Sequence, residues 1–323
     1  SFKGQADVAG LLLSRGVDVN ARPRASLGSL LFDRRAVGPR TPLYQAVEAG
    51  HKDVAELLLA YGAQSDRATD DLLKTIPTVL HEAVEKGDVA RVQSLLATGI
   101  DVEAKDRYGW TALPIAARDG RKRVAELLLD GGADANANAK GGTTVLGCAV
   151  ASRNRDLVEL VLARGAKPNL FAAAFLGDRA GAKALLSGGA KASDKMPWRS
   201  GTALHFATNR EVAELLMAHG ADVKARDHEH WTPLHYASQR GDGDTVRLLL
   251  ASGAEADAKS FGDTRPLGLA VAGGHQDVAK KLLAAGADVN AKDEMGRSPL
   301  ARARQVGREE MVQLLREHGA QER

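Results

Sequence analysis

The residues of this chain with the clearest capacity for chemistry lie close together in the segment DHEHWTPLHYA, residues 227–237. His228 and His230 flank Glu229, so in an extended segment the two imidazoles share a face and could hold a metal ion or exchange protons. Zinc sites use three or four protein ligands, and no third or fourth ligand occurs here at a useful spacing. We therefore expect a solvated, partner-facing loop, with no metal and no other cofactor.

Two further features that could carry chemistry are weaker. Cys148 is the single cysteine, and no histidine lies beside it in the repeat pattern described below, so we interpret it as a small apolar filler rather than a nucleophile. The glycine pairs at 131–132, 141–142 and 188–189 lack the lysine and the strand-to-helix context of a phosphate loop. The sequence thus contains no catalytic constellation, and we expect that the protein is not an enzyme.

The composition excludes several classes of function. The 323 residues include 44 basic and 41 acidic side chains, a net charge of +3 that gives no sign of nucleic-acid or membrane binding. No apolar run approaches the roughly 20 residues that span a bilayer. Hydrophobic residues make up 44% of the chain and aromatic residues only 4%, which favours thin, closely stacked helices. One cysteine does not decide the compartment: we favour the cytoplasm, with the periplasm and secretion left open.

A repeated pattern determines which elements position these residues. Glycines that end an apolar run recur most often every 33 residues, as at Gly99, Gly132 and Gly165. A second register agrees, because nine hexapeptides align without gaps, each with Leu third and Ala sixth: TPLYQA (41–46), TVLHEA (78–83), TALPIA (111–116), TVLGCA (144–149), PNLFAA (168–173), TALHFA (202–207), TPLHYA (232–237), RPLGLA (265–270) and SPLARA (298–303). We call each hexapeptide a box.

The boxes, the period of 33 and endings such as GADVNAKD (286–293) resemble the ankyrin repeat family over nearly the whole chain. The resemblance implies an all-α repeat solenoid of helix-turn-helix units joined by β-hairpin or loop fingers. About ten repeats are expected, with the first truncated and the sixth atypical. In the family the first helices line a concave surface beside the fingers, and the second helices form the convex back.

The physical chemistry of one unit supports the same elements. Thr232 before Pro233 is typical of a helix start, because a hydroxyl can cap free backbone N–H groups and proline at the first helical position loses no needed hydrogen bond. Gly241 ends this first helix, and a second helix follows until Gly253. One such pair cannot bury its own apolar face, so we expect stability to come from stacking on neighbouring units.

Departures from the period predict how the single domain, residues 1–323, is divided. Extra residues replace a normal finger between 21 and 40 and again around 68–77, while a finger is absent after Gly165, where we expect a notch. The expected segments are a truncated first repeat with a long inserted loop (1–40), regular repeats (41–165), an atypical repeat without a finger (166–201), regular repeats (202–297) and a C-terminal capping repeat (298–323).

The repeat pattern also reinterprets the histidine-rich segment. His235 matches His81 and His205, and the resemblance implies a structural hydrogen bond that fixes the turn rather than a ligand role. Asp227 begins a finger tip, where a short acid can bond its own turn. His230 stands where other repeats have Gly109 and Gly296, so we expect either a different turn or a strained one.

A binding function should lie where the units differ from one another. Family members usually engage partners through finger tips and the ends of the first helices, and aromatic residues with arginine are the preferred anchors of protein interfaces. The predicted contact residues are Arg107, Tyr108, Trp110, Arg118, Trp198, His228, Glu229, His230, Trp231, Tyr236, Gln239, Phe261, Met295 and Arg297. Arg153 and Arg240 are further helix-end candidates. An equally weighted alternative is that tryptophans before a box only pack against the adjacent finger.

The function predicted from these observations is a non-catalytic scaffold that binds a protein or peptide through finger tips and groove. The alternative is a regulatory or targeting arm of a larger polypeptide, favoured by an N-terminal stacking face that looks uncapped and could itself make contacts. A third hypothesis, a metal-dependent enzyme using His228 and His230, would be eliminated by metal-free purified protein. Interspersed acids argue against single-stranded nucleic acid. We expect a monomer that binds neither nucleic acid nor membranes.

Overall fold

The computed structural model describes residues 15–16, 18–20, 41–48, 52–60, 62–64, 79–97, 99–106, 108–139, 141–197 and 199–321. The chain forms two compact units, Ser1–Lys140 and Gly141–Arg323. The predicted insertions within 21–40 and 68–77, together with Arg107 and Trp198, lie outside the described residues. The remaining predicted contact residues can all be placed.

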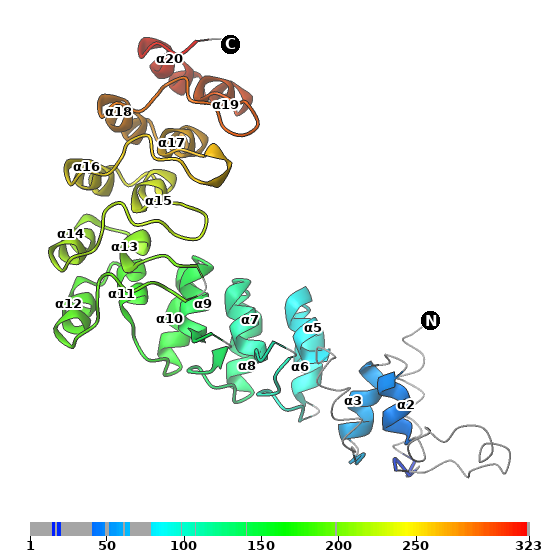
Figure 1. Ribbon diagram of the computed structural model, residues 1–323. Helices are drawn as coiled ribbons and strands as arrows, with labels where there is room; N and C mark the ends of the chain where they lie inside the picture. Colours follow the sequence, from blue (N-terminus) through cyan, green and yellow to red (C-terminus); the bar gives the residue numbers. More distant parts are fainter. Residues whose placement is uncertain are drawn as a thin grey trace, which may run out of the picture. The chain divides into compact units, whose positions relative to one another are not determined.

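In its described residues the first unit contains helix pairs, which are followed by strand β1. The pairs are α2 (Pro42–Glu48) with α3 (Lys52–Ala60), α5 (Val79–Lys86) with α6 (Val89–Ala97), and α7 (Ala112–Arg118) with α8 (Lys122–Asp130), and β1 is Asn138–Ala139. The two helices of each pair pack on each other, α5 packs on α7, and α6 packs on α8. First helices therefore form one layer of the stack and second helices another (Figure 1).

The second unit repeats this arrangement with two layers of helices. It begins with strand β2 (Thr143–Thr144). Its elements are then α9 (Val145–Ala151), α10 (Arg155–Ala163), α11 (Leu170–Leu176), α12 (Arg179–Ser187), α13 (Ala203–Phe206), α14 (Arg210–Ala218), α15 (Pro233–Arg240), α16 (Gly243–Ala251), the 3-10 turn η1 (Phe261–Asp263), α17 (Pro266–Gly273), α18 (Gln276–Ala284), α19 (Pro299–Gln305) and α20 (Glu309–Glu317). Figure 1 shows α15, α17 and α19 side by side, as their mutual contacts require.

The core is built from the invariant positions of the boxes. The leucine at the third place is fully buried in α15 (Leu234) and nearly so in α17 (Leu267), and Ala237 and Ala270 at the sixth place have no exposed surface. A small side chain at this place allows neighbouring first helices to approach closely. Each helix pair buries its apolar stripe on the next pair, and the predicted all-α repeat fold is confirmed.

The box histidines fix the start of the first helices. In α15 the Thr232 N–H donates to His235 Nδ1 (3.1 Å), and His235 Nε2 donates to the Thr264 carbonyl of the next finger (3.2 Å). His205 makes the same pair of contacts, to Thr202 and to the carbonyl of Trp231. The predicted structural role is confirmed, and each histidine joins its own helix start to the following repeat.

The irregular repeats change the local spacing of elements in the second unit. No strand or helix separates α10, which ends at Ala163, from α11, which begins at Leu170. The next first helix, α13, contains only 4 residues. A full turn of helix is therefore missing from the first-helix layer between α11 and α15. The boundaries of the predicted segments otherwise stay a prediction.

Candidate functional site

Three predicted contact residues of the first unit line one hollow. Tyr108, Trp110 and Arg118, together with Glu85, Asp106 and Ile115, surround a cavity of about 410 Å³ at the junction of the finger with α5 and α7. The Tyr108 side chain is 58% exposed. The Arg118 guanidinium carbon lies 5.8 Å from the centre of the Trp110 ring, within the range of a cation–π contact. The hollow thus combines aromatic surface with charges of both signs.

The hollow is held in shape by hydrogen bonds within the finger. Asp106 accepts the backbone N–H groups of Tyr108 and Trp110, both at 2.8 Å. The Trp110 carbonyl accepts from His81 Nε2 on the preceding repeat, also at 2.8 Å. Trp110 is half-buried. It is therefore a fixed wall of the hollow, and Tyr108 is the side chain left most open to a partner.

In the second unit the finger tips form a connected row. The His228 N–H donates to the Arg199 carbonyl (3.1 Å), and the Phe261 N–H donates to the Glu229 carbonyl (3.0 Å). The Glu294 N–H continues the row by donating to the Gly262 carbonyl (3.2 Å). Backbone hydrogen bonds between successive tips hold their variable side chains at fixed spacing.

His230 keeps the turn that other repeats make with glycine. Its φ of 62° is left-handed, as at Gly109 and Gly296, so the strained alternative is confirmed and the different turn is wrong. The turn is held by Asp227, whose Oδ1 accepts the N–H groups of Glu229 (2.9 Å) and Trp231 (2.8 Å). The His230 ring stacks on Phe261 of the next finger with centroids 3.9 Å apart. Stacking between the two tips compensates for part of the backbone strain.

Trp231 and Tyr236 pack inside the repeat. Their ring centroids are 4.9 Å apart, and the Tyr236 hydroxyl donates to Asp227 Oδ2 (2.5 Å). Burial, together with this hydrogen bond to a carboxylate, raises the pKa of the Tyr236 phenol. Tyr236 is 8% exposed and Trp231 is half-buried. These contacts favour the packing alternative for Trp231 and leave only a small part of Tyr236 accessible.

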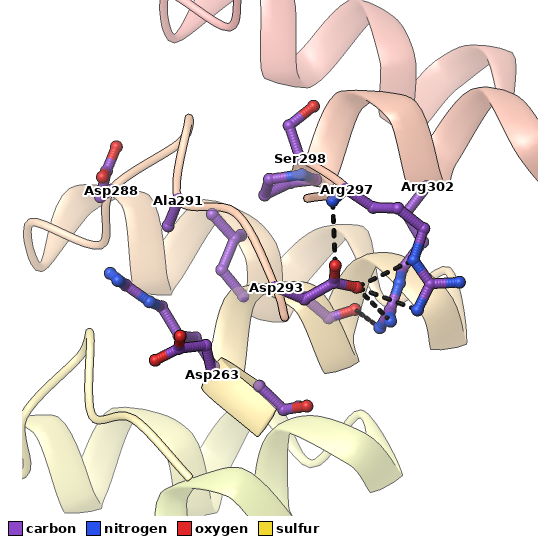
Figure 2. Close-up of a pocket in the computed structure, with 12 residues that line it drawn as sticks. Asp263, Asp288, Ala291, Asp293, Arg297, Ser298 and Arg302 are labelled. Carbon is purple, nitrogen blue, oxygen red and sulfur yellow. Dashed lines mark hydrogen bonds and ion pairs between the residues drawn. The ribbon is translucent and has the colours of Figure 1, made fainter. Parts of the chain in front are cut away.

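In the last finger, hydrogen bonds to Asp293 hold the predicted contact residue Arg297 in place. Asp293 Oδ1 accepts the N–H of Arg297 and its Oδ2 accepts from the Arg297 Nε, both at 2.9 Å, while Arg302 Nη2 donates to the same Oδ2 at 3.1 Å (Figure 2). Desolvation opposes ionisation of Asp293, but these hydrogen bonds and charges outweigh it and lower its pKa. Met295 in the same tip is 69% exposed. Met295, rather than Arg297, is therefore the side chain of this finger that is most accessible to a partner.

Sequence reasoning gave too little weight to Arg153. This residue occupies the turn after α9, and its guanidinium carbon lies 4.0 Å from the centre of the Tyr236 ring on α15. The signal for it was available, since Arg153 stands at the turn position that is glycine in most repeats, such as Gly120 and Gly241.

Among the residues that the structure describes, no group of three or more His, Cys, Asp or Glu side chains is arranged to hold a metal ion. Cys148 is completely buried in α9. In the same described ranges, no helix has the length and apolar character needed to cross a bilayer.

Comparison with known families gives a consistent result along the chain. Ankyrin repeats, in three copies of a multi-repeat profile, match residues 80–172, 170–260 and 255–322. A single ankyrin repeat matches residues 40–70. These matches cover most of the sequence, although they do not establish the predicted count of ten repeats.

Individual relatives match shorter segments. The ankyrin repeat and KH domain-containing protein mask-1 of Caenorhabditis elegans is 31% identical over 128 residues, 40% of this chain but only 4% of that protein. The 2-5A-dependent ribonuclease of Mus musculus is 50% identical over 50 residues, 15% of this chain and 7% of that protein. Cyclin-dependent kinase 4 inhibitor B of Rattus norvegicus is 32% identical over 126 residues, 39% of this chain and 84% of that protein.

Proposed function

The chain belongs to the ankyrin-repeat family, and from this premise we propose that it is a non-catalytic module that binds a protein or peptide along its finger tips and its layer of first helices. Ankyrin repeats generally mediate protein–protein interaction. They are generally non-catalytic. The binding surface depends on this chain's own residues, because function lies in the site rather than in the fold.

The observation that carries the proposal is where the exposed apolar side chains lie. In the described part of the chain, the exposed large hydrophobic residues are Leu59, Tyr108, Phe261, Met295 and Val306. Tyr108, Phe261 and Met295 occupy the two variable tip positions of three different fingers, and they are 58%, 62% and 69% exposed. Large apolar side chains held open to water at equivalent places in a repeat are typical of an interaction surface.

Rigidity supports the same surface. In the second unit, successive finger tips are joined by backbone hydrogen bonds. The turns that begin at Asp106, Asp227 and Asp293 are each held by hydrogen bonds to the aspartate. Binding to such a preformed surface costs less conformational entropy than binding to a flexible loop, because the surface does not have to be ordered first. Several modest contacts along the row can then sum to a specific complex.

Affinity capture from a lysate of the source organism tests this proposal. We expect one or more proteins retained by the wild-type chain to be lost when Tyr108→Ala, Phe261→Ala and Met295→Ala are combined. Because these side chains are mostly exposed, the combined variant should melt within a few degrees of the wild type, which is checked by circular dichroism. Each exposed aromatic anchor removed should weaken binding by about 1–2 kcal/mol.

Leu59→Ala supplies the matched control, since Leu59 is also an exposed apolar residue but lies on the second helix α3. It should leave capture unchanged. Equal retention by the wild type and the combined tip variant would move the binding surface away from the fingers. Loss of binding by Leu59→Ala alone would place it on the second helices.

The second candidate function is a regulatory or targeting arm of a larger polypeptide. Some relatives favour this function, because the segment that matches this chain is only a small part of them. One is mask-1, whose name combines ankyrin repeats with a KH domain. Reading the gene upstream of Ser1 distinguishes the two. An adjoining catalytic or channel domain would support the arm, and an open reading frame limited to these repeats would support a free-standing binder.

A further inference from the structure

One repeat of the second unit has a residue with a side chain in the left-handed turn that follows its first helix. In the repeats of α11, α15, α17 and α19 this turn contains a left-handed glycine: Gly177 (φ 74°), Gly241 (φ 76°), Gly274 (φ 75°) and Gly307 (φ 67°). After α9 the same position is Arg153, which keeps the left-handed conformation with φ 59°. A side chain in this conformation costs free energy that glycine avoids. Backbone strain retained at one position of a repeat raises the question of what the side chain does there.

The strained turn directs Arg153 across the layer of first helices. Its guanidinium carbon lies 4.0 Å from the centre of the Tyr236 ring, and its Nη1 lies 3.4 Å from Gln239 Oε1. Both partners are on α15, although α11 and α13 come between α9 and α15 in the chain. The contact spans these two helices, of which α13 has only 4 residues.

The charges around Arg153 are not balanced by a direct carboxylate partner. In the ranges that the structure describes, Arg153 forms no ion pair, and Arg199 and Arg240 are close enough to interact with it electrostatically. Burial lowers the pKa of Arg153, and Arg199 adds to this effect, while Tyr236 and the carboxylate of Asp227 oppose it. Burial also lowers the pKa of Arg240 to about 10, although Asp242 opposes this effect. Positive charge is therefore concentrated where water is partly excluded.

The two nearby carboxylates already have hydrogen-bond donors. Asp227 accepts two backbone N–H groups and the Tyr236 hydroxyl. Asp242 Oδ1 accepts the Thr245 N–H at the start of α16, while its Oδ2 is buried with no hydrogen-bond partner among the described residues. In the described ranges neither forms an ion pair with Arg153, although Asp227 is near enough to favour the charged guanidinium. An additional anion would thus be attracted to a preformed, electropositive position on the first-helix layer.

We propose that Arg153, oriented by Tyr236 and Gln239, forms a receptor for an oxyanion on a peptide side chain, either a carboxylate or a phosphoryl group. The proposal rests on the proposed function, because the peptide belongs to the bound partner. A guanidinium has planar paired donors that suit both oxyanions, and stacking on an aromatic ring limits its orientations. Exposed Gln239 can in addition hydrogen-bond the peptide backbone.

Selection of peptides tests the receptor directly. The chain is immobilised at pH 7 and a phage-displayed random peptide library is enriched on it, after which enriched peptides are synthesised with a fluorescent label and their affinities measured by anisotropy. We expect Asp or Glu at a fixed position in the enriched peptides. Replacing that acid by its amide should weaken binding to the wild type by about tenfold or more, as expected for a lost charge-assisted pair.

The decisive variant is Arg153→Gly, because it restores the residue that the turn prefers and should melt at or above the wild-type temperature. It should bind the acidic and amide peptides alike, and Arg153→Lys should fall between the two because it keeps charge without the planar fork. Arg247→Ala on α16, which removes an exposed arginine paired with Asp244, should behave as wild type. A peptide with phosphoserine at the acidic position distinguishes the two oxyanions. If it binds the wild type more tightly than the acidic peptide does, and Arg153→Gly loses this gain, the receptor favours a phosphoryl group.

Other outcomes separate this inference from the proposed function. Peptides that bind without an acid, or that bind Arg153→Gly as well as wild type, would overturn the receptor while leaving protein binding intact. Failure to enrich any peptide, with proteins still captured from lysate, would also count against the receptor. Failure of both peptide selection and capture would overturn the two proposals together.

Discussion

Replacing His235 with alanine lowers the free energy of unfolding by about 3 kcal/mol or more, the largest single-site loss that we expect in this chain. The side chain has no exposed surface. Its removal leaves the Thr232 amide and the Thr264 carbonyl without their partner in the interior and opens a space beside the Trp231 ring, which lies 5.7 Å away. Urea denaturation followed by circular dichroism measures the loss.

His228→Ala is the matched control for this prediction. The His228 side chain is 42% exposed at a finger tip, so its replacement should change the free energy of unfolding by less than about 0.5 kcal/mol. Equal losses for the two variants would contradict the assignment of His235 to the scaffold and of His228 to the partner-facing tip.

Acidification should destabilise the second unit through the same histidines. Burial lowers the pKa of His205 and of His235 from 6.5 to about 4, so in the folded state both rings stay neutral well below the pH at which the unfolded chain binds protons. The contribution of the two neutral histidines to the free energy of unfolding is then fully present above pH 6.5, and it is lost as the pH falls toward 4. The loss amounts to about 2 kcal/mol per histidine between pH 6.5 and pH 5.

The double variant His205→Gln and His235→Gln isolates this effect. Glutamine at the same helical position can still bond the backbone of a capping threonine, but it does not titrate. Denaturation midpoints at pH 7 and pH 5 should differ strongly for the wild type and only weakly for the variant. A wild-type midpoint that is unchanged between the two pH values would show that the rings are not held neutral by burial.

Much of the scaffold could be predicted because its causes are local in sequence. Thr232 and Pro233 begin α15, Gly241 ends it in a left-handed turn, and His235 bonds back to Thr232 three residues away. Repetition then supplied confirmation, because the same residue types recur at the same spacing in other boxes. For the same reason, the sequence limited the turn at His230 to two alternatives, a different turn or a strained one, and the structure has the strained one.

The contacts between repeats could not be predicted in this way. The meeting of Arg153 with Tyr236 depends on how far α13 extends and on which rotamer each side chain adopts, and neither is specified by the period. Packing of Trp231 on Tyr236, and the bond from Tyr236 to Asp227, similarly decide which predicted contact residues remain accessible. The sequence indicated that the finger tips carry contact residues. Side-chain packing decides that Tyr108, Phe261 and Met295 are exposed while neighbouring residues are held by contacts within the repeat.

Hydrogen exchange of the chain with and without a captured partner tests the central claim most directly, that binding occurs on the finger tips and first-helix layer. We expect slower exchange on complex formation in segments 106–118, 227–240, 260–264 and 293–297, with little change in the second helices α8, α14, α16 and α18. Protection confined to those second helices, with the finger tips exchanging as in the free chain, would contradict it.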